Sequence, residues 1–279
     1  MSVSLALAIT TGSGLAQNQS PDTATASATQ DTTPRAGLVV STPGQGAVSG
    51  NVVRRLVCLS VLIALAPAFM NAQNSGGAPG AVVEFRPGLF STSPPEGLTV
   101  AGNPQVIDSP FGKAAQFDGK DDGYFLPVNP LEGLSEFTLE AVFRPDGDGP
   151  AEQRFVHFGQ VMGDRVLLET RVANGQWHLD TFIAGGGPGR PMIDPKLVHP
   201  TDRWYHVAFV VRNGRLSNYV NGVLELEGQV PYTPMKGGAA SIGVRLNRQS
   251  WFKGAIYSVR ITPRALAPGE FTLSKPQAE

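Results

Sequence analysis

The sequence predicts an all-β protein, an antiparallel β-sandwich or barrel, from three observations. Apolar residues alternate with a period of two along several short segments after Val82, which is the pattern of half-buried strands. Three Asn-Gly pairs each lie between strand-like segments, and the chain is rich in glycine (33) and proline (23), as expected where turns are frequent. Because 41% of the 279 residues are hydrophobic, the chain can form a substantial core.

Two segments show the strand pattern most clearly. The segment 137–145, "FTLEAVFRP", places its apolar side chains on one face and polar ones such as Thr138 and Glu140 on the other, so it predicts a half-buried strand. The segment 204–211, "WYHVAFVV", is apolar on both faces apart from His206. It predicts a strand that is covered on both sides.

The Asn-Gly pairs predict how consecutive strands connect. Asn-Gly accepts the positive φ values of a type I′ turn, whose twist suits antiparallel strands. Residues 166–183 are therefore expected to form a hairpin, and residues 204–228 a three-stranded meander. Further strands are expected at residues 114–118, 123–128, 154–160, 240–245 and 253–261, with one helical turn at 267–271.

The region before the strands divides into three parts. Residues 1–51 are a low-complexity extension rich in Ser, Thr, Ala and Gly, and we interpret them as the product of a start codon assigned too early. Residues 52–72 contain two arginines, a short apolar run and small residues, as in a secretory signal peptide that is cleaved near its end. Residues 73–80 are expected to be a linker, and residues 81–275 a single domain.

Composition excludes several classes of function. With 22 basic and 23 acidic residues the net charge is -1, so nucleic acid is not an expected partner. The single cysteine, Cys58, lies inside the predicted signal peptide, so the mature chain is expected to contain no disulfide and no membrane span. The protein is expected to be secreted or otherwise extracytoplasmic, in the periplasm or at the cell surface.

Several segments together resemble a known family. In order along the chain they are "GKAAQFDGKDDGYFLPV", "FTLEAVFRP", "WYHVAFVVRNGRLSNYVNG" and "FKGAIYSVRITPRALAPGEF". They are similar to the laminin-G-like domains of the concanavalin A-like lectin/glucanase superfamily. The resemblance implies a jelly roll of two curved antiparallel sheets, with ligands at the concave face or the rim loops, in glycan-binding, adhesive or enzymatic proteins. Tyr257 and Ser258 stand where the family commonly has acidic residues, which removes one expected polar or metal-binding position.

Three carboxylates are clustered in "FDGKDD", at Asp118, Asp121 and Asp122. Calcium prefers carboxylate and carbonyl oxygens from a loop of this kind, so these residues are a candidate calcium site. The alternative is a turn between two strands, which Asp and Gly favour without any ligand. The turn is the favoured interpretation, and a second acidic loop at 146–149 has the same alternative.

Catalytic patterns are weak in this sequence. The glucanase signature Glu-x-Asp-x-x-Glu does not occur, and the nearest arrangements are Glu225 with Glu227 and His178 with Asp180. No Gly-x-Ser-x-Gly motif is present, and the histidines lack the close spacing of metal ligands, so His206 is expected to be structural, hydrogen-bonded between the sheets. The chain is therefore predicted not to be an enzyme, although carboxylates from separate strands could still converge.

Glycan sites usually combine an aromatic platform with a few polar groups. Trp251, together with Asn247 and Arg248 of the polar loop before it, is the first candidate platform, and Trp177 is the second. Trp204 lies in the doubly apolar strand and is expected in the core. The predicted function is a secreted non-catalytic module that binds glycans or extracellular protein surfaces. The alternatives are a polysaccharide-active enzyme of the same fold, a glycoside hydrolase or lyase, and a purely structural or adhesive domain.

Overall fold

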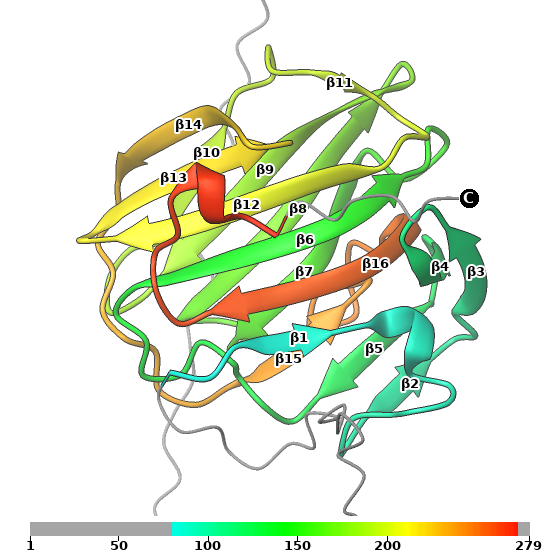
Figure 1. Ribbon diagram of the computed structural model, residues 1–279, viewed down its shortest axis with the longest axis horizontal. Helices are drawn as coiled ribbons and strands as arrows, with labels where there is room; N and C mark the ends of the chain where they lie inside the picture. Colours follow the sequence, from blue (N-terminus) through cyan, green and yellow to red (C-terminus); the bar gives the residue numbers. More distant parts are fainter. Residues whose placement is uncertain (1–79, 273–279) are drawn as a thin grey trace, which may run out of the picture. The chain divides into compact units, whose positions relative to one another are not determined.

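The computed structural model describes residues 80–272, which form two antiparallel sheets packed face to face (Figure 1). This arrangement confirms the predicted antiparallel β-sandwich. The predicted low-complexity extension, signal peptide and linker (except residue 80), and residues 273–275 at the end of the predicted domain, lie outside the described residues.

Sheet A contains eight strands, ordered β14-β13-β12-β6-β16-β4-β3, with β1 paired to the far end of β16. These strands are β1 (Val83–Phe85), β3 (Gln105–Ser109), β4 (Gly112–Asp118), β6 (Phe137–Pro145), β12 (Tyr205–Arg212), β13 (Arg215–Val220), β14 (Val223–Gln229) and β16 (Lys253–Thr262).

Sheet B also contains eight strands, ordered β10-β9-β8-β7-β15-β5-β2, with β11 paired to β9. These strands are β2 (Thr99–Ala101), β5 (Gly123–Leu126), β7 (Glu152–Gly159), β8 (Arg165–Ala173), β9 (Gln176–Ala184), β10 (Arg190–Ile193), β11 (His199–Pro200) and β15 (Ala239–Ile242). Two short 3₁₀ helices, Pro87–Leu89 and Pro268–Glu270, complete the described elements, and the second confirms the helical turn expected at 267–271.

The Asn-Gly turns confirm the predicted hairpin and meander. Asn174, Asn213 and Asn221 have φ values of 54°, 49° and 49°, and the glycine after each is also positive. They connect β8 to β9, β12 to β13 and β13 to β14, each an antiparallel pair. Two consecutive positive φ values are the requirement of the type I′ turn.

The core lies between the two sheets and is rich in aromatic rings. Phe143 of β6 stacks on Phe155 of β7 with ring centroids 4.4 Å apart, and meets Trp177 of β9 edge to face at 5.1 Å. Each of these rings is fully buried. Burial of such a side chain contributes about 1.5–3 kcal/mol, so contacts between rings of opposite sheets hold the sandwich together.

The C-terminal segment crosses the outer face of sheet A and covers part of it. Ala208 and Val210 of β12 pack under Ala265, Leu266 and Phe271, which confirms that this strand is covered on both sides.

The same cover corrects the half-buried prediction for β6. Thr138 is fully buried and Glu140 nearly so beneath the C-terminal segment. The backbone amide of Leu266 donates to the Thr138 side chain at 2.8 Å, and that of Thr272 to the Glu140 side chain at 2.7 Å. His206 pairs with Glu140 on this outer face at 2.9 Å, and not between the sheets as predicted. Within residues 80–272, no helix is long and apolar enough to cross a bilayer.

Candidate functional site on the outer face of sheet B

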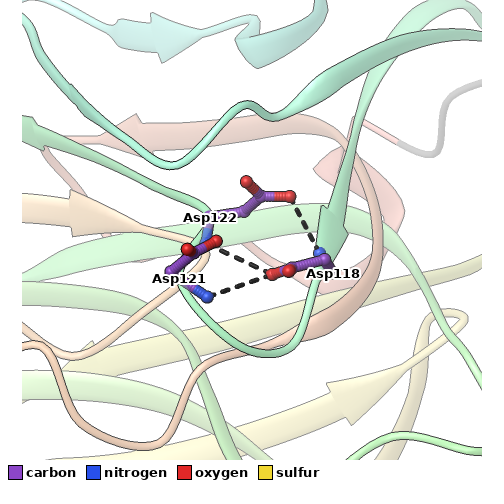
Figure 2. Close-up of side chains that lie close together, drawn as sticks. All are labelled: Asp118, Asp121 and Asp122. Carbon is purple, nitrogen blue, oxygen red and sulfur yellow. Dashed lines mark hydrogen bonds between the residues drawn. The ribbon is translucent and has the colours of Figure 1, made fainter.

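The acidic loop predicted from the sequence forms a compact turn between β4 and β5. One ligand oxygen from each of Asp118, Asp121 and Asp122 can be chosen so that all lie within 4.8 Å of one another. Figure 2 shows Asp118 reaching back into its own loop, where it accepts hydrogen bonds from backbone amides. Its Oδ1 atom accepts from the amides of Lys120, Asp121 and Asp122 at 2.8, 3.1 and 3.3 Å.

The pKa values of this loop follow from its hydrogen bonds and burial. Burial alone would raise the pKa of Asp118, but the three amides together hold it below its ordinary value. Burial raises the pKa of Asp122, with the charges of Asp118 and Asp121 adding to the effect. Asp122 also accepts from the amide of Asn103 at 2.6 Å, which ties this turn to the β2–β3 connection. The loop is thus a well-formed turn by its own hydrogen bonds, and calcium stays a prediction.

Trp177, predicted as a ligand platform, presents no surface to a ligand. It is fully buried and packs against Phe143 and Tyr205, so its role in this structure is in the core. For Trp204 the prediction was wrong in the opposite direction. It was expected in the core, yet it is only half-buried on the outer side of sheet A, 5.8 Å from the ring of Phe111.

The other three predicted ligand residues lie together in the loop that joins β15 to β16, residues 243–252. Asn247 donates to the side chain of Gln249 at 2.9 Å, and Arg248, which is exposed, lies 4.6 Å from the ring centroid of Phe125 on β5. Trp251 is half-buried and packs close to Gly123. This segment is called the rim loop below.

Beside the rim loop, the outer face of sheet B carries an ion network that sequence reasoning missed. Glu169 of β8 pairs in register with Asp180 of β9 on one side and with Arg154 of β7 on the other. Alternation along the strands places all three side chains on the face away from the core. Arg171, two residues from Glu169, shares that face.

The network is closely bonded. Arg171 donates from Nε and Nη2 to Asp180 Oδ2 at 2.9 and 2.6 Å, and its Nη1 lies 2.6 Å from Glu152. Arg154 Nε lies 3.1 Å from Glu169, and its Nη1 donates to Ser250 of the rim loop at 2.6 Å. The rim loop and the network therefore form one continuous surface.

The two carboxyl groups differ in what surrounds them. Burial raises the pKa of Glu169 to about 7, the neighbouring Asp180 adds to the rise, and Arg154 and Arg171 oppose it. Asp180 is as buried as Glu169 but receives two hydrogen bonds from Arg171. The pair combines a carboxyl group whose pKa is raised to about 7 with one that is hydrogen-bonded to arginine.

The other predicted polar pairs do not converge. Asp180 is bound by Arg171 from the neighbouring strand, while His178 lies opposite Arg171 in register. Glu225 bonds to His199 at 2.7 Å, and Glu227 bonds to the exposed Arg215. Neither pair assembles the two carboxylates that glycan cleavage uses.

A sequence signal for the network was present in the hairpin. A type I′ turn at Asn174-Gly175 fixes the register, so residues equally far from the turn lie opposite each other. Glu169 and Asp180 are each five residues from the turn, and the structure pairs them. Two carboxylates opposite each other on one face are unfavourable unless compensated, which itself predicts nearby cations.

Two stacked antiparallel sheets, one with a polar outer face beside a rim loop, define an antiparallel β-sandwich protein. The family model described as the concanavalin A-like lectin/glucanases superfamily matches residues 118–271, more than half of the sequence. The chain belongs to this superfamily, as the sequence resemblance predicted. The family description includes both lectins and glucanases, so membership leaves open whether a member binds or cleaves its ligand.

Comparison with one solved structure supports the same fold. The chain is similar to domain 4 of AbnA, a GH43 extracellular arabinanase from Geobacillus stearothermophilus solved in complex with arabinotriose. The TM-score is 0.52 at 21% identity, covering 69% of this chain and 97% of that domain. The binding domain of Paraclostridial Mosquitocidal Protein 1 gives a TM-score of 0.49 at 15% identity, with 64% and 46% of the two chains covered. A comparison with curated protein sequences finds no match.

Proposed function

We propose that this protein is a secreted, non-catalytic module that binds carbohydrate on the outer face of sheet B. The observation that carries the proposal is the ion network of Arg154, Glu169, Arg171 and Asp180 beside the rim loop. Sugar hydroxyl groups both donate and accept hydrogen bonds, and planar guanidinium and carboxylate groups held in fixed positions suit them. Trp251 at the edge of this surface would supply the apolar contact.

The accessible members of the surface give the contacts a ligand would make. The side chain of Glu152 is 60% exposed and that of Arg171 is 24% exposed, while Glu169 and Asp180 lie beneath them. A ligand would therefore bond to Glu152 and Arg171 directly. The buried carboxylates would hold the arginines in place.

The binding test uses the full chain and a panel of soluble polysaccharides in affinity gel electrophoresis. Domain 4 of the arabinanase was solved with arabinotriose, so debranched arabinan is a reasonable first member of the panel. We expect retention by at least one polysaccharide, weakened by Glu152→Ala and by Trp251→Ala. The matched control is Glu227→Ala, which removes an exposed glutamate from the outer part of sheet A. Equal retention of all four proteins would contradict the proposal.

A second candidate function is polysaccharide cleavage, favoured by one observation. Glu169 and Asp180 lie opposite each other, and the raised pKa of Glu169 is the property of a general acid. A reducing-sugar assay on the same panel separates the two functions. Product release that Glu169→Gln abolishes, without loss of retention, would identify an enzyme and replace the non-catalytic proposal.

The secreted location belongs to the proposal as well. Expression of the full chain in a host that exports proteins, followed by N-terminal sequencing of the product, tests it. We expect a mature N-terminus after Ala68 or Ala72, because both sites follow the apolar run and small residues. A product that retains residues 17–50 would contradict both the early-start interpretation and the cleaved signal.

A further inference from the structure

Three half-buried aromatic side chains meet on the outer side of sheet A, away from the network described above. They are Phe111 in the β3–β4 turn, Trp204 just before β12, and Tyr257 of β16. The ring centroid of Phe111 lies 5.8 Å from that of Trp204 and 5.4 Å from that of Tyr257. These three residues are called the aromatic patch.

The position of Tyr257 depends on a break in the register of β16. Pairing with β6 shifts between Ile256 and Ser258, so Tyr257 is the extra residue of a β-bulge. A bulge re-aims the side chain that it inserts. The guanidinium carbon of Arg86 lies 3.8 Å from the Tyr257 ring centroid, which fixes the ring on this face.

A row of polar side chains runs beside the patch across neighbouring strands. Gln116 of β4 and Arg144 of β6 both lie next to Ala255 of β16 in register. Because Ala255 has only a methyl group, the two longer side chains meet above it, where Arg144 donates to Gln116 at 2.8 Å. Asp146 accepts from Gln116 at 2.8 Å and from Arg144 Nε at 3.3 Å. Trp204 is next in this row, with its ring centroid 5.8 Å from the Arg144 guanidinium.

The charges beside the aromatic patch are balanced, and this balance favours an uncharged ligand over an acidic one. Arg144 faces Asp146 at 3.3 Å, and Arg86 faces Glu84 at 3.7 Å. Each arginine of the patch thus already has a carboxylate partner, so an acidic ligand would have to displace one. An uncharged ligand with an apolar face and several hydroxyl groups matches the aromatic rings and the balanced polar row.

We propose that the aromatic patch is a second binding site, separate from sheet B, for an uncharged oligosaccharide. The C–H face of a sugar ring packs on Trp204, while Tyr257, whose ring is covered by Arg86, lies beside it. Its hydroxyl groups bond to Gln116, Arg144 and Asp146. Two sites on opposite sheets would let one domain bind two chains, or one chain twice, and raise the apparent affinity for a polymer.

The test uses affinity gel electrophoresis of the full chain on arabinan, xylan, mannan and β-glucan, which are uncharged, and on polygalacturonate, which is acidic. Trp204→Ala should weaken retention on at least one uncharged polysaccharide about tenfold, the effect of losing one aromatic contact of about 1.4 kcal/mol. Gln116→Ala is a second variant, since it removes a surface amide and leaves the rings in place. It should weaken retention on the same polysaccharide about threefold.

Tyr219→Ala is the matched control. Tyr219 is a half-buried ring on the same side of sheet A, packed on Phe271, and it lines a groove of about 400 Å³ with Arg215 and Leu266. The Tyr219→Ala variant should bind each polysaccharide within about twofold of the parental affinity. Circular dichroism and thermal unfolding of each variant show whether it is folded.

The outcomes separate this inference from the proposed function. Weaker retention of folded Trp204→Ala and Gln116→Ala, with Tyr219→Ala unchanged, supports the second site whatever the sheet B variants do. Parental retention by both patch variants overturns it, even if Glu152→Ala and Trp251→Ala lose binding. A loss confined to Tyr219→Ala would place the ligand in the groove and also overturn it. The inference would also be overturned if the parent protein were retained only by polygalacturonate, or by none of the polysaccharides.

Discussion

Arg171 holds two buried carboxyl groups at once: its Nη2 atom lies 2.6 Å from Asp180 and 3.8 Å from Glu169, which face each other across β8 and β9. Two acidic side chains opposite each other would repel if both were charged and alone. The arginine on one side and the raised pKa of Glu169 on the other relieve that repulsion. The network therefore depends on both charge and pH.

Replacing Arg171 should destabilise the fold. In Arg171→Gln, Asp180 would remain buried without its partner, and we expect a loss of about 3 kcal/mol in the free energy of unfolding. This is the low end for a broken buried pair, because Arg171 is partly exposed. Urea unfolding at neutral pH measures it. The control is Arg215→Gln, whose pair with Glu227 is exposed on both sides, so its loss should change the free energy of unfolding far less than the loss of Arg171. Equal losses in the two variants would contradict the account.

Glu169 should make stability fall as pH rises. Its pKa is about 7 in the folded protein and about 4.5 when unfolded, so the folded state binds the proton more tightly. Its contribution is complete below the unfolded pKa and is lost as pH rises toward and through 7. In Glu169→Gln this dependence disappears, so the stability difference between variant and parent should change steadily from pH 4.5 to 8. A stability difference between Glu169→Gln and the parent that stays constant from pH 4.5 to 8 would show that Glu169 does not titrate in this range.

His157 should act in the opposite direction. Burial lowers its pKa to about 4, while Gln160 accepts from one ring nitrogen and the amide of Leu246 bonds to the other. The unfolded state binds the proton more tightly, so stability is complete above about pH 6.5 and is lost as pH falls toward 4. His157→Gln should remove this loss at the cost of lower stability at pH 7. If the melting temperature of His157→Gln fell as steeply between pH 7 and pH 4 as that of the parent, the prediction would be contradicted.

The acidic loop should stabilise the fold through hydrogen bonds. Asp118→Ala removes the acceptor of three amides and should cost about 1 kcal/mol, since two of these hydrogen bonds are exposed to water, whereas Asp121→Ala, at an exposed position, should be nearly neutral. Thermal unfolding of the parent with calcium and with a chelator completes the test, and we expect equal midpoints. A midpoint that calcium raises by several degrees would establish the metal site and reject the simple turn.

The long strands could be predicted because their signals are local. Alternation marked β6, and Asn-Gly turns marked the β8–β9 hairpin and the meander from β12 to β14. The short strands β1, β2, β10 and β11 gave no such signal, since two to four residues carry too little periodicity. Their pairing is decided by the neighbouring strand.

The site was harder to predict because it depends on contacts distant in sequence. Alternation with Leu179 and Ile183 could have placed Trp177 in the core. Trp204, in contrast, directly precedes a strand that is apolar on both faces, so the alternation of apolar and polar residues does not show on which side of the sheet its side chain lies. The cover over Glu140 comes from residues more than a hundred positions later, and the bulge at Tyr257 is a register shift in the pairing of β16 with β6, which is also distant in sequence.

The place of β16 in sheet A also governs when the domain can fold. This strand lies between β6 and β4, and it pairs with β1 at its far end, so the two ends of the domain meet on it. Until β16 leaves the ribosome, β6 and β4 each lack a partner on that side. Such non-local pairing favours slow folding that follows synthesis. This domain therefore completes its fold only after β16, the last of its described strands, has been made.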